Sequence, residues 1–254
     1  MAFEEQQPFD PASFEHIPVL LNECLTGLAI DPAGTYLDGT AGGAGHSRQI
    51  ALRLDAAKGG RLISLDQDPD AVQTARSRLA GLPATVVQIN FRYAGQALEQ
   101  LGIEKINGAL LDLGVSSHQL DDAARGFSYR ADAPLDMRMD QRNALSAYEV
   151  VNDYSEENLS RILHEYGEER FARKIAHNIC VSRQQAPIRT TGELIEIIKR
   201  SIPAKIRATG GHPAKRTFQA IRIEVNQELT VLSESLDGMI DPVSYTHLRA
   251  HETD

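Results

Sequence analysis

The sequence predicts an α/β fold in which helices cover both faces of a parallel β-sheet. Short apolar stretches alternate with helical patterns as far as Gly114, which is typical of parallel strands joined by right-handed crossovers. The first stretch ends in Asp38 and runs into a loop with four glycines between positions 39 and 45. The second ends in Asp66, 21 positions after Gly45. This spacing predicts a ligand site at the carboxyl edge of the sheet.

The elements before Gly114 follow from local patterns. Helical periodicity over residues 16–29 places five side chains on one face: Val19, Leu20, Cys24, Leu25 and Leu28. Nearly continuous apolar runs, typical of strands buried on both faces, predict strands at residues 35–39, 61–66, 85–89 and 108–113. Helices are predicted at residues 47–54 and 93–101, and after Asp68, an N-cap followed by Pro69.

The pattern changes after Gly114. Residues 115–143 form a long polar stretch without a clean period, and such stretches are usually functional or disordered. Residues 146–201 have helical patterns, with Ser155 as an N-cap and a capping box from Thr190 to Glu193. One longer helix is predicted over residues 215–236. Its apolar face comprises Phe218, Ile221, Val225, Leu229 and Leu232.

Composition favours a cytoplasmic protein that does not contact a membrane. The chain has 254 residues, 42% of them hydrophobic, and no apolar run reaches the ~18 residues of a membrane span. Its start is acidic and polar, unlike a signal peptide. Cys24 and Cys180 are far apart and are expected to be buried thiols. The histidines at positions 46, 118 and 212 form no metal-ligand pattern, so no metal is expected.

The net charge of −9 is unevenly distributed. Residues 168–222 contain 12 Lys and Arg against four acids, a balance of +8 that leaves −17 for the remainder. A basic segment joined to an acidic remainder indicates contact with a polyanion such as RNA. A solvated helical surface explains the same charge, and the sequence leaves both interpretations open.

The glycine loop fits either a dinucleotide or S-adenosylmethionine. After Gly45 the chain continues with His46, Ser47 and Arg48, so the third glycine of the dinucleotide pattern is absent. Asp38 would repel a bound pyrophosphate but not the ammonium and sulfonium of S-adenosylmethionine. The sequence therefore favours the methyl donor.

Several stretches occur in the order seen in one family and together cover residues 14–240. They are HIPVLL (16–21), DGTAGGAGHS (38–47), LLDLGVSS (110–117), LDDA (120–123), GFS (126–128), PLDMRM (134–139), YGEERF (166–171) and HPAKRTFQA (212–220). In these motifs the chain resembles the MraW/RsmH family of bacterial ribosomal RNA methyltransferases. That family methylates the N4 amine of a decoding-centre cytidine in small-subunit 16S ribosomal RNA.

The resemblance implies a Rossmann-like class I methyltransferase sheet with an inserted helical domain. The implied parts are a donor-binding core at 14–115, a mainly helical RNA-recognition insertion at 116–212 and a return helix at 213–241. After Pro242 the family continues with further strands, whereas this chain has an unrelated tail at 242–254. We expect that tail to be non-native and the chain to be C-terminally truncated, lacking the strands beyond the fourth.

The resemblance also implies roles for individual residues. The donor's amino-acid end would lie against Ala44, Gly45 and His46, its ribose against Asp66 and its adenine against Phe91. Asp112 and Gln119 would complete the donor site, and Phe91 has the alternative of being a core residue. Five basic residues are candidate RNA phosphate contacts, although ion pairs within the protein are an equal alternative: Arg138, Arg170, Arg173, Lys215 and Arg216.

Methyl transfer to a cytosine amine requires alignment and an acceptor for the amine hydrogen, because the nitrogen lone pair is delocalised into the ring. Asp112 is the candidate catalytic residue, and a nearby backbone carbonyl is the other candidate acceptor. Donor positioning and capping of the turn at Gly114 are alternative roles for Asp112. Ser116 and Ser117 are weaker candidates, with capping of the turn as the alternative. Many amino-methyltransferases carry (Asn/Asp)-Pro-Pro-aromatic here, whereas this chain has Asp112-Leu113-Gly114-Val115.

Two broader alternatives remain open at this point. The chain could be an inactive fragment that only binds donor or RNA. It could also methylate a different RNA, a protein or a small molecule. The sequence does not indicate the oligomeric state or which assembly stage of the 30S subunit is the substrate.

Overall fold

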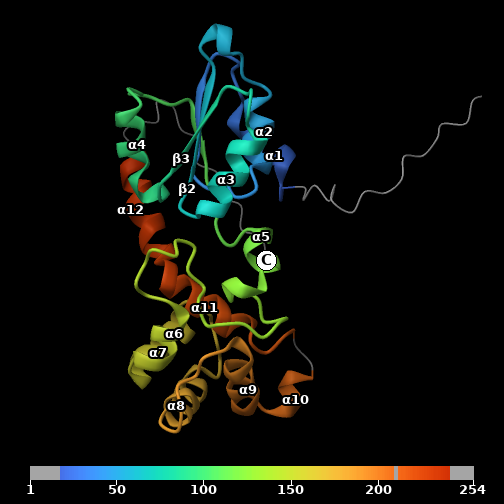
Figure 1. Cartoon of the computed structure of the whole chain (residues 1–254), viewed down its shortest axis with the longest axis vertical. Coiled ribbons are helices and arrows are strands. Elements are labelled where there is room, and N and C mark those ends of the chain that lie inside the picture. Colours follow the sequence, from blue (N-terminus) through green and yellow to red (C-terminus); the bar gives the residue numbers. More distant parts are fainter. Residues whose placement is uncertain (1–17, 209–210, 241–254) are drawn as a thin grey trace, which may run out of the picture.

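The computed structural model describes residues 18–208 and 211–240, with side chains as far as residue 236. The chain forms a sheet lobe, built from residues 18–114 and the last helix, and a helical lobe, built from residues 127–226 (Figure 1). Residues 115–126 connect the two lobes. Within the described ranges, no helix has the length and apolar character of a membrane span. The predicted non-native tail lies outside these ranges.

The sheet lobe confirms the predicted fold class. Four parallel strands, β1 (Thr35–Asp38), β2 (Arg61–Asp66), β3 (Ala84–Gln88) and β4 (Gly108–Leu110), are ordered β3-β2-β1-β4. β4 is shorter than the predicted strand at 108–113. Strand order reverses between β1 and β4, so the carboxyl edge there is the topological switch point at which open α/β sheets bind ligands.

Helices cover both faces of this sheet, as predicted. They are α1 (Leu21–Leu28), α2 (Gly45–Ala51), α3 (Pro69–Arg78) and α4 (Ala94–Gln100), with the short helix η3 (Phe91–Tyr93) before α4. Tyr36 and Leu62 pack beneath α1, α2 and α3, whereas their neighbours Leu37 and Ile63 pack beneath α4. Successive strand residues therefore point to opposite faces, and both faces are buried. Asp68 caps α3 through the Asp70 N–H, as predicted.

The prediction of a helix beginning at residue 16 was wrong within the described part of the chain. Leu20 has a left-handed backbone with φ 53°, which an α-helix cannot continue, so α1 begins at Leu21. Val19 is consequently 52% exposed rather than part of the buried face. Leu25 and Leu28 do pack against the sheet cluster.

The helical lobe has its own core. Its helices are α6 (Ala147–Asp153), α7 (Glu156–Glu165), α8 (Ala172–Arg183), α9 (Thr191–Ser201), α10 (Ala204–Arg207) and α11 (Lys215–Asn226). Side chains from Phe127 to Val225 form one buried apolar cluster. The predicted caps are confirmed, because Ser155 accepts from the Asn158 N–H and Thr190 forms a capping box with Glu193.

The polar stretch at 115–143 is more ordered than its sequence predicts. It contains α5 (Ser117–Asp121) and the short helix η4 (Ala123–Arg125). Ser116 and Gln119 form a capping box, a sequence signal for α5 that periodicity alone did not reveal. Ser116 is thus the N-cap of a helix, in agreement with the alternative that it caps local structure.

The prediction of one helix over 215–236 was also wrong. Gln227 has φ 52° and divides the segment into α11 and α12 (Glu228–Ile240). The break changes which side chains face inward: Leu229 is 50% exposed, while Val231 and Ser235 are buried. α11 belongs to the helical core, and α12 returns to pack against η3 and α4 of the sheet lobe (Figure 1).

A buried ion pair joins the two lobes. Arg125 donates to Asp68 at 2.9 Å and to Asp70 at 3.1 Å, and the side chains of Arg125 and Asp68 are 4% and 1% exposed. Arg125 also donates to the carbonyls of Arg138 and Met139. Because both charges are buried, each depends on the other for its stability in the folded protein.

We expect Arg125→Met to lower the free energy of unfolding by about 3–5 kcal/mol, because it leaves the Asp68 carboxylate buried without its cation. Urea titration measures the loss. Arg142→Met is the matched control, since Arg142 is 69% exposed in its pair with Asp140, and its loss should stay below about 1 kcal/mol. Equal small losses in both variants would contradict a structural role for the buried pair.

Candidate active site

The glycine loop after β1 is held by hydrogen bonds to its neighbours. The Gly42 N–H donates to Asp66 Oδ2 at 2.8 Å, and the Gly43 carbonyl accepts from Arg78 at 2.6 Å. Gly42 and Ala44 have φ 48° and 60°, so the loop turns through the left-handed region twice before α2 begins. The loop therefore has a defined shape at the switch point of the sheet.

Gly45 is required by the protein itself. A Cβ at this position would lie 2.4 Å from Cγ of Pro18. The sequence predicts that Gly45 lets a ligand approach the backbone. The contact with Pro18 is a second reason why this position requires glycine. A side chain at position 45 would displace the segment that precedes α1.

A buried polar cluster lies beneath the loop. The Ser47 hydroxyl donates to Asp38 Oδ2 at 2.5 Å and lies 2.7 Å from the Ser64 hydroxyl, and the Thr40 N–H donates to Asp38 Oδ1. Asp38 is 1% exposed. Burial raises the pKa of Asp38, and the hydrogen bonds from Ser47 and Thr40 oppose that rise. Sequence reasoning missed Ser47 and Ser64, because nothing local marks a serine that faces a buried carboxylate.

Asp66 lies at the end of β2, where the sequence places the ribose-binding acid. Its two carboxylate oxygens accept from the N–H groups of Gly42 and Asp68. Burial raises the pKa of Asp66 to about 6, against the lowering effect of these two hydrogen bonds. A carboxylate offers about four acceptor positions, so Asp66 retains capacity for hydroxyl donors.

His46 and Asp112 face one another across the switch point. His46 is buried, with Nε2 3.1 Å from the Val19 carbonyl and Nδ1 3.7 Å from Asp112 Oδ2. The Asp112 N–H donates to the Thr40 hydroxyl at 2.7 Å. The Asp112 side chain is 55% exposed, and within the described residues its carboxylate makes no hydrogen bond to the turn at Gly114. Its carboxylate is therefore accessible at the edge of the sheet.

Gln119 and Phe91 complete the predicted donor residues. Gln119 is buried; its Oε1 accepts from the Ser116 N–H, and its Nε2 donates to Asp68 at 2.8 Å. Phe91 is partly buried against the sheet core and lies beside Gly39. The structure thus brings the predicted donor residues together around the ends of β1, β2 and β4. Phe91 packs against the core and is only partly buried.

The five predicted RNA contacts have different environments. Arg138 is half-buried and donates to both oxygens of Asp136 and to the Asn143 carbonyl. Arg216 donates to the Glu168 carbonyl at 2.8 Å. The side chains of Arg170, Arg173 and Lys215 are exposed and make no ion pair or hydrogen bond with the described residues. Those three cations are available to an external anion.

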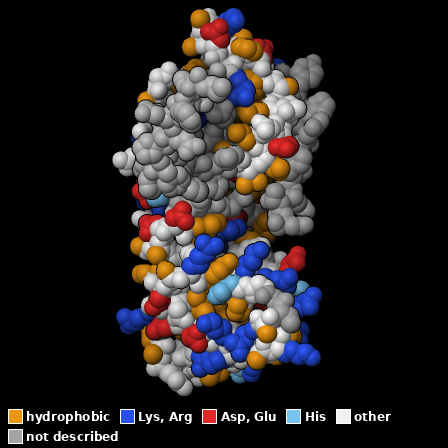
Figure 2. Space-filling view, turned by 90° about the vertical axis from the view of Figure 1, so that its right-hand side faces the viewer, with side chains coloured by type: hydrophobic (Ala, Val, Ile, Leu, Met, Phe, Trp, Pro, Cys, Tyr) orange, Lys and Arg blue, Asp and Glu red, His pale blue; other side chains and the backbone are white. Residues whose placement is uncertain are grey.

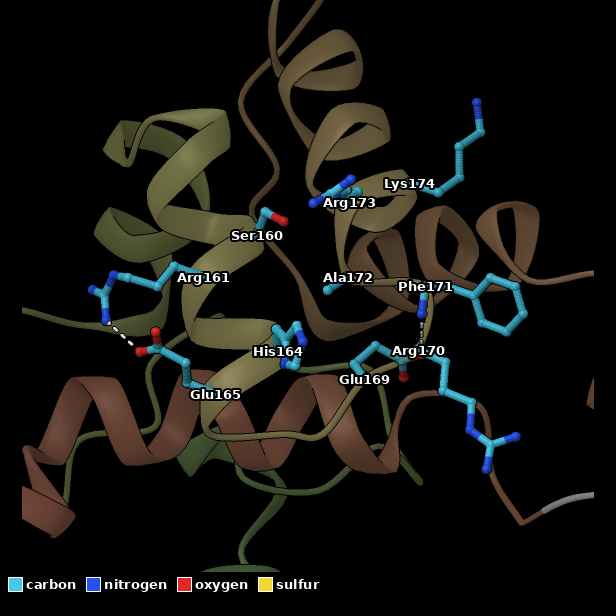
Figure 3. Close-up of a pocket in the computed structure, with 10 residues that line it drawn as sticks. All are labelled: Ser160, Arg161, His164, Glu165, Glu169, Arg170, Phe171, Ala172, Arg173 and Lys174. Carbon is cyan, nitrogen blue, oxygen red and sulfur yellow. Dashed lines mark hydrogen bonds and ion pairs between the residues drawn. The ribbon is translucent and has the colours of Figure 1, made fainter.

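The pocket in Figure 3 lies in the helical lobe and has a volume of ≈ 640 Å³. It is lined by Ser160, Arg161, His164, Glu165, Glu169, Arg170, Phe171, Ala172, Arg173 and Lys174. Arg161 pairs with Glu165 at 3.0 Å, and Glu169 accepts from the Phe171 N–H. The remaining Arg and Lys side chains are unpaired among the described residues, and Figure 2 shows Lys and Arg spread widely over this lobe. None of the predicted donor residues lines this pocket.

Two further predictions concern cysteines and metals. Cys24 and Cys180 are unpaired and only partly buried, and burial raises the pKa of both thiols. Residues 18–208 and 211–240 contain no group of three His, Cys, Asp or Glu side chains able to hold a metal.

Comparison with known proteins identifies the family of the chain. A model of the MraW methylase family matches residues 13–246. Ribosomal RNA small subunit methyltransferase H of Lachnospira eligens is 57% identical over 230 residues, covering 90% of this chain and 72% of that protein. The corresponding enzyme of Brevibacillus brevis is 53% identical over 231 residues, covering 90% and 73%. A methylase requires a methyl donor, which excludes the dinucleotide alternative. The chain therefore belongs to the MraW methylase family, which uses S-adenosylmethionine.

Proposed function

We propose that the chain transfers a methyl group from S-adenosylmethionine to the N4 amine of a cytidine in small-subunit ribosomal RNA. The observation that carries this proposal is the convergence of the glycine loop, Asp66 and the exposed Asp112 carboxylate at the switch point of the sheet. The names of the relatives support the RNA as the acceptor. The excess of Lys and Arg in the helical lobe independently supports RNA as the acceptor, because positive charge attracts a polyanion.

The donor site would use backbone and acidic groups. Ala44, Gly45 and His46 would surround the amino-acid end of the donor, and Asp66 would accept from its ribose hydroxyls. Phe91 would lie against the adenine ring, where an aromatic face is useful. Gln119 would contribute to the donor site from the inserted segment. Its hydrogen bond to Asp68, two residues after Asp66 in the sequence, holds its side chain near the end of β2.

We expect donor affinity to fall about tenfold between pH 7 and pH 5. The pKa of Asp66 is about 6, so the carboxyl is ionised at pH 7 and mostly protonated at pH 5, where it accepts ribose hydroxyls less well. Asp66→Asn should bind at least tenfold more weakly at pH 7 and show no such pH dependence. Calorimetry at both pH values measures this. Equal affinity of the unmodified protein at pH 5 and pH 7 would contradict the assignment.

Asp112 is the proposed residue at the acceptor amine. The bound donor supplies an activated methyl group, and the chain must align the amine with it and accept hydrogen bonding from the amine. The Thr40 hydroxyl fixes the backbone of Asp112, and its exposed carboxylate lies beside His46. Asp112 could therefore polarise the amine or hold the donor, and these two roles predict different kinetics.

Methylation is tested with labelled donor and small subunits from cells that lack this modification, followed by digestion to nucleosides. We expect label in N4-methylcytidine. If Asp112 polarises the amine, Asp112→Asn should lower the single-turnover rate at saturating donor about 10²-fold, or ~2.7 kcal/mol. If it only positions the donor, saturating donor should restore most of the rate. Label in another nucleoside or in protein would refute the proposed function.

The RNA would contact the helical lobe through its unpaired cations. Arg170, Arg173 and Lys215 are better placed for this than Arg138 and Arg216, whose guanidinium groups already bond to protein oxygens. Phosphate contacts release counterions, so each one contributes to the salt dependence of binding.

We expect the triple variant Arg170→Glu, Arg173→Glu and Lys215→Glu to bind RNA more weakly, with a salt slope smaller by up to about 3. The matched control is the triple variant Arg53→Glu, Lys58→Glu and Lys105→Glu, which changes the net charge by the same amount. These three residues belong to the sheet lobe and precede β2 or β4 in the sequence. Filter binding over a range of salt concentrations measures both slopes. An equal change in the two triple variants would mean that only net charge matters.

A further inference from the structure

Tyr129 and His212 form a stacked ring pair at the surface of the helical lobe. Their ring centroids are 4.3 Å apart, and the ring planes differ by 9°. Phe218 of α11 meets the Tyr129 ring edge-on at 5.9 Å and is itself buried. The pair is therefore supported from the core side by a third ring.

The imidazole of His212 is held in one orientation. The Ala214 N–H donates to its Nδ1 at 3.3 Å, which leaves Nδ1 without a proton and places the ring hydrogen on Nε2. Burial and, to a smaller degree, the nearby Lys199 lower the pKa of His212. The ring is therefore neutral at physiological pH, and a neutral ring stacks without the cost of desolvating a charge.

His212 remains exposed although Tyr129 covers one of its faces. A ring that only contributed to packing would be buried like Phe218. Lys199 lies close enough to influence the His212 ring but pairs with Glu196 at 2.8 Å, whereas Lys215, whose N–H bonds to the His212 carbonyl, has a side chain without a partner among the described residues. Figure 2 shows His side chains on this lobe bordered by hydrophobic side chains and by Lys and Arg. An open aromatic face beside cations is the surface that single-stranded nucleic acid uses.

We propose that the open face of His212, backed by Tyr129, stacks one unpaired base of the RNA substrate while Lys215 contacts an adjoining phosphate. This proposal rests on the proposed function, because it requires RNA as the substrate. Stacking tolerates any base, so the ring pair would position the strand without reading its sequence. The Nε2–H of His212 remains as a donor toward an acceptor on the RNA.

The test uses short single-stranded RNA carrying 2-aminopurine, whose fluorescence is quenched when it stacks. We expect His212→Leu to weaken binding about fivefold to hundredfold and to abolish the quench. The salt slope should not change, because no phosphate contact is removed. His212→Trp should retain affinity and quench, since it preserves an aromatic face. His177→Leu is the matched control, because His177 is an exposed histidine of the same lobe that pairs with Glu156.

Two results would overturn the ring pair as a base platform. Equal losses for His212→Leu and His212→Trp would mean that the ring face does not stack, and unchanged binding with a lowered melting temperature would mean that the pair only packs. If the unmodified protein methylates small subunits and the His212 variants bind RNA normally, only the proposal of a base platform fails. If the unmodified protein binds no RNA at all, the proposed function fails as well.

Discussion

The carboxylate of Asp68 caps α3 and also accepts hydrogen bonds from Gln119 and Arg125 of the segment that connects the lobes. Its backbone N–H donates to Asp66, the proposed ribose acceptor. Arg125 in turn donates to the carbonyls of Arg138 and Met139. One buried carboxylate thus connects the donor edge of the sheet to the path of the chain into the helical lobe. Removing the Asp68 carboxylate would lower the stability of the fold and also alter the geometry of the proposed donor site, because its oxygens bond to groups of both.

The connecting segment and its continuation link the two proposed binding surfaces. Gln119 faces the donor residues, Tyr129 forms the ring pair with His212, and the Met139 N–H donates to Asn226 at the end of α11. RNA bound to the helical lobe and donor bound at the sheet would therefore contact the same stretch of chain. This arrangement gives a physical route by which RNA binding could align a cytidine with the donor.

Much of the fold followed from local sequence signals, and so did the position of the candidate site. The apolar runs predicted four parallel strands, and Asp68 followed by Pro69 predicted the start of α3. The breaks at Leu20 and Gln227 were not predictable in this way, because each depends on one residue in a left-handed conformation. At Gln227 that conformation is accompanied by a tertiary hydrogen bond from Arg92, and an ion pair between Arg222 and Glu228 spans the turn. Leucine and glutamine rarely adopt this conformation, so neither Leu20 nor Gln227 indicates a turn from its residue type alone.

The sequence by itself determined the α/β class, the glycine loop with its two strand-end acids, and the family. These features depend on residues close together in the chain or on motifs in a fixed order. Only the tertiary structure decided which polar side chains are already paired. Arg125 bonds to Asp68, 57 positions away, and Arg216 bonds to the Glu168 carbonyl, 48 positions away, whereas Arg170 and Arg173 find no partner among the described residues. Hydrogen bonds and charge pairs between distant residues depend on the path of the chain, which local propensity does not specify.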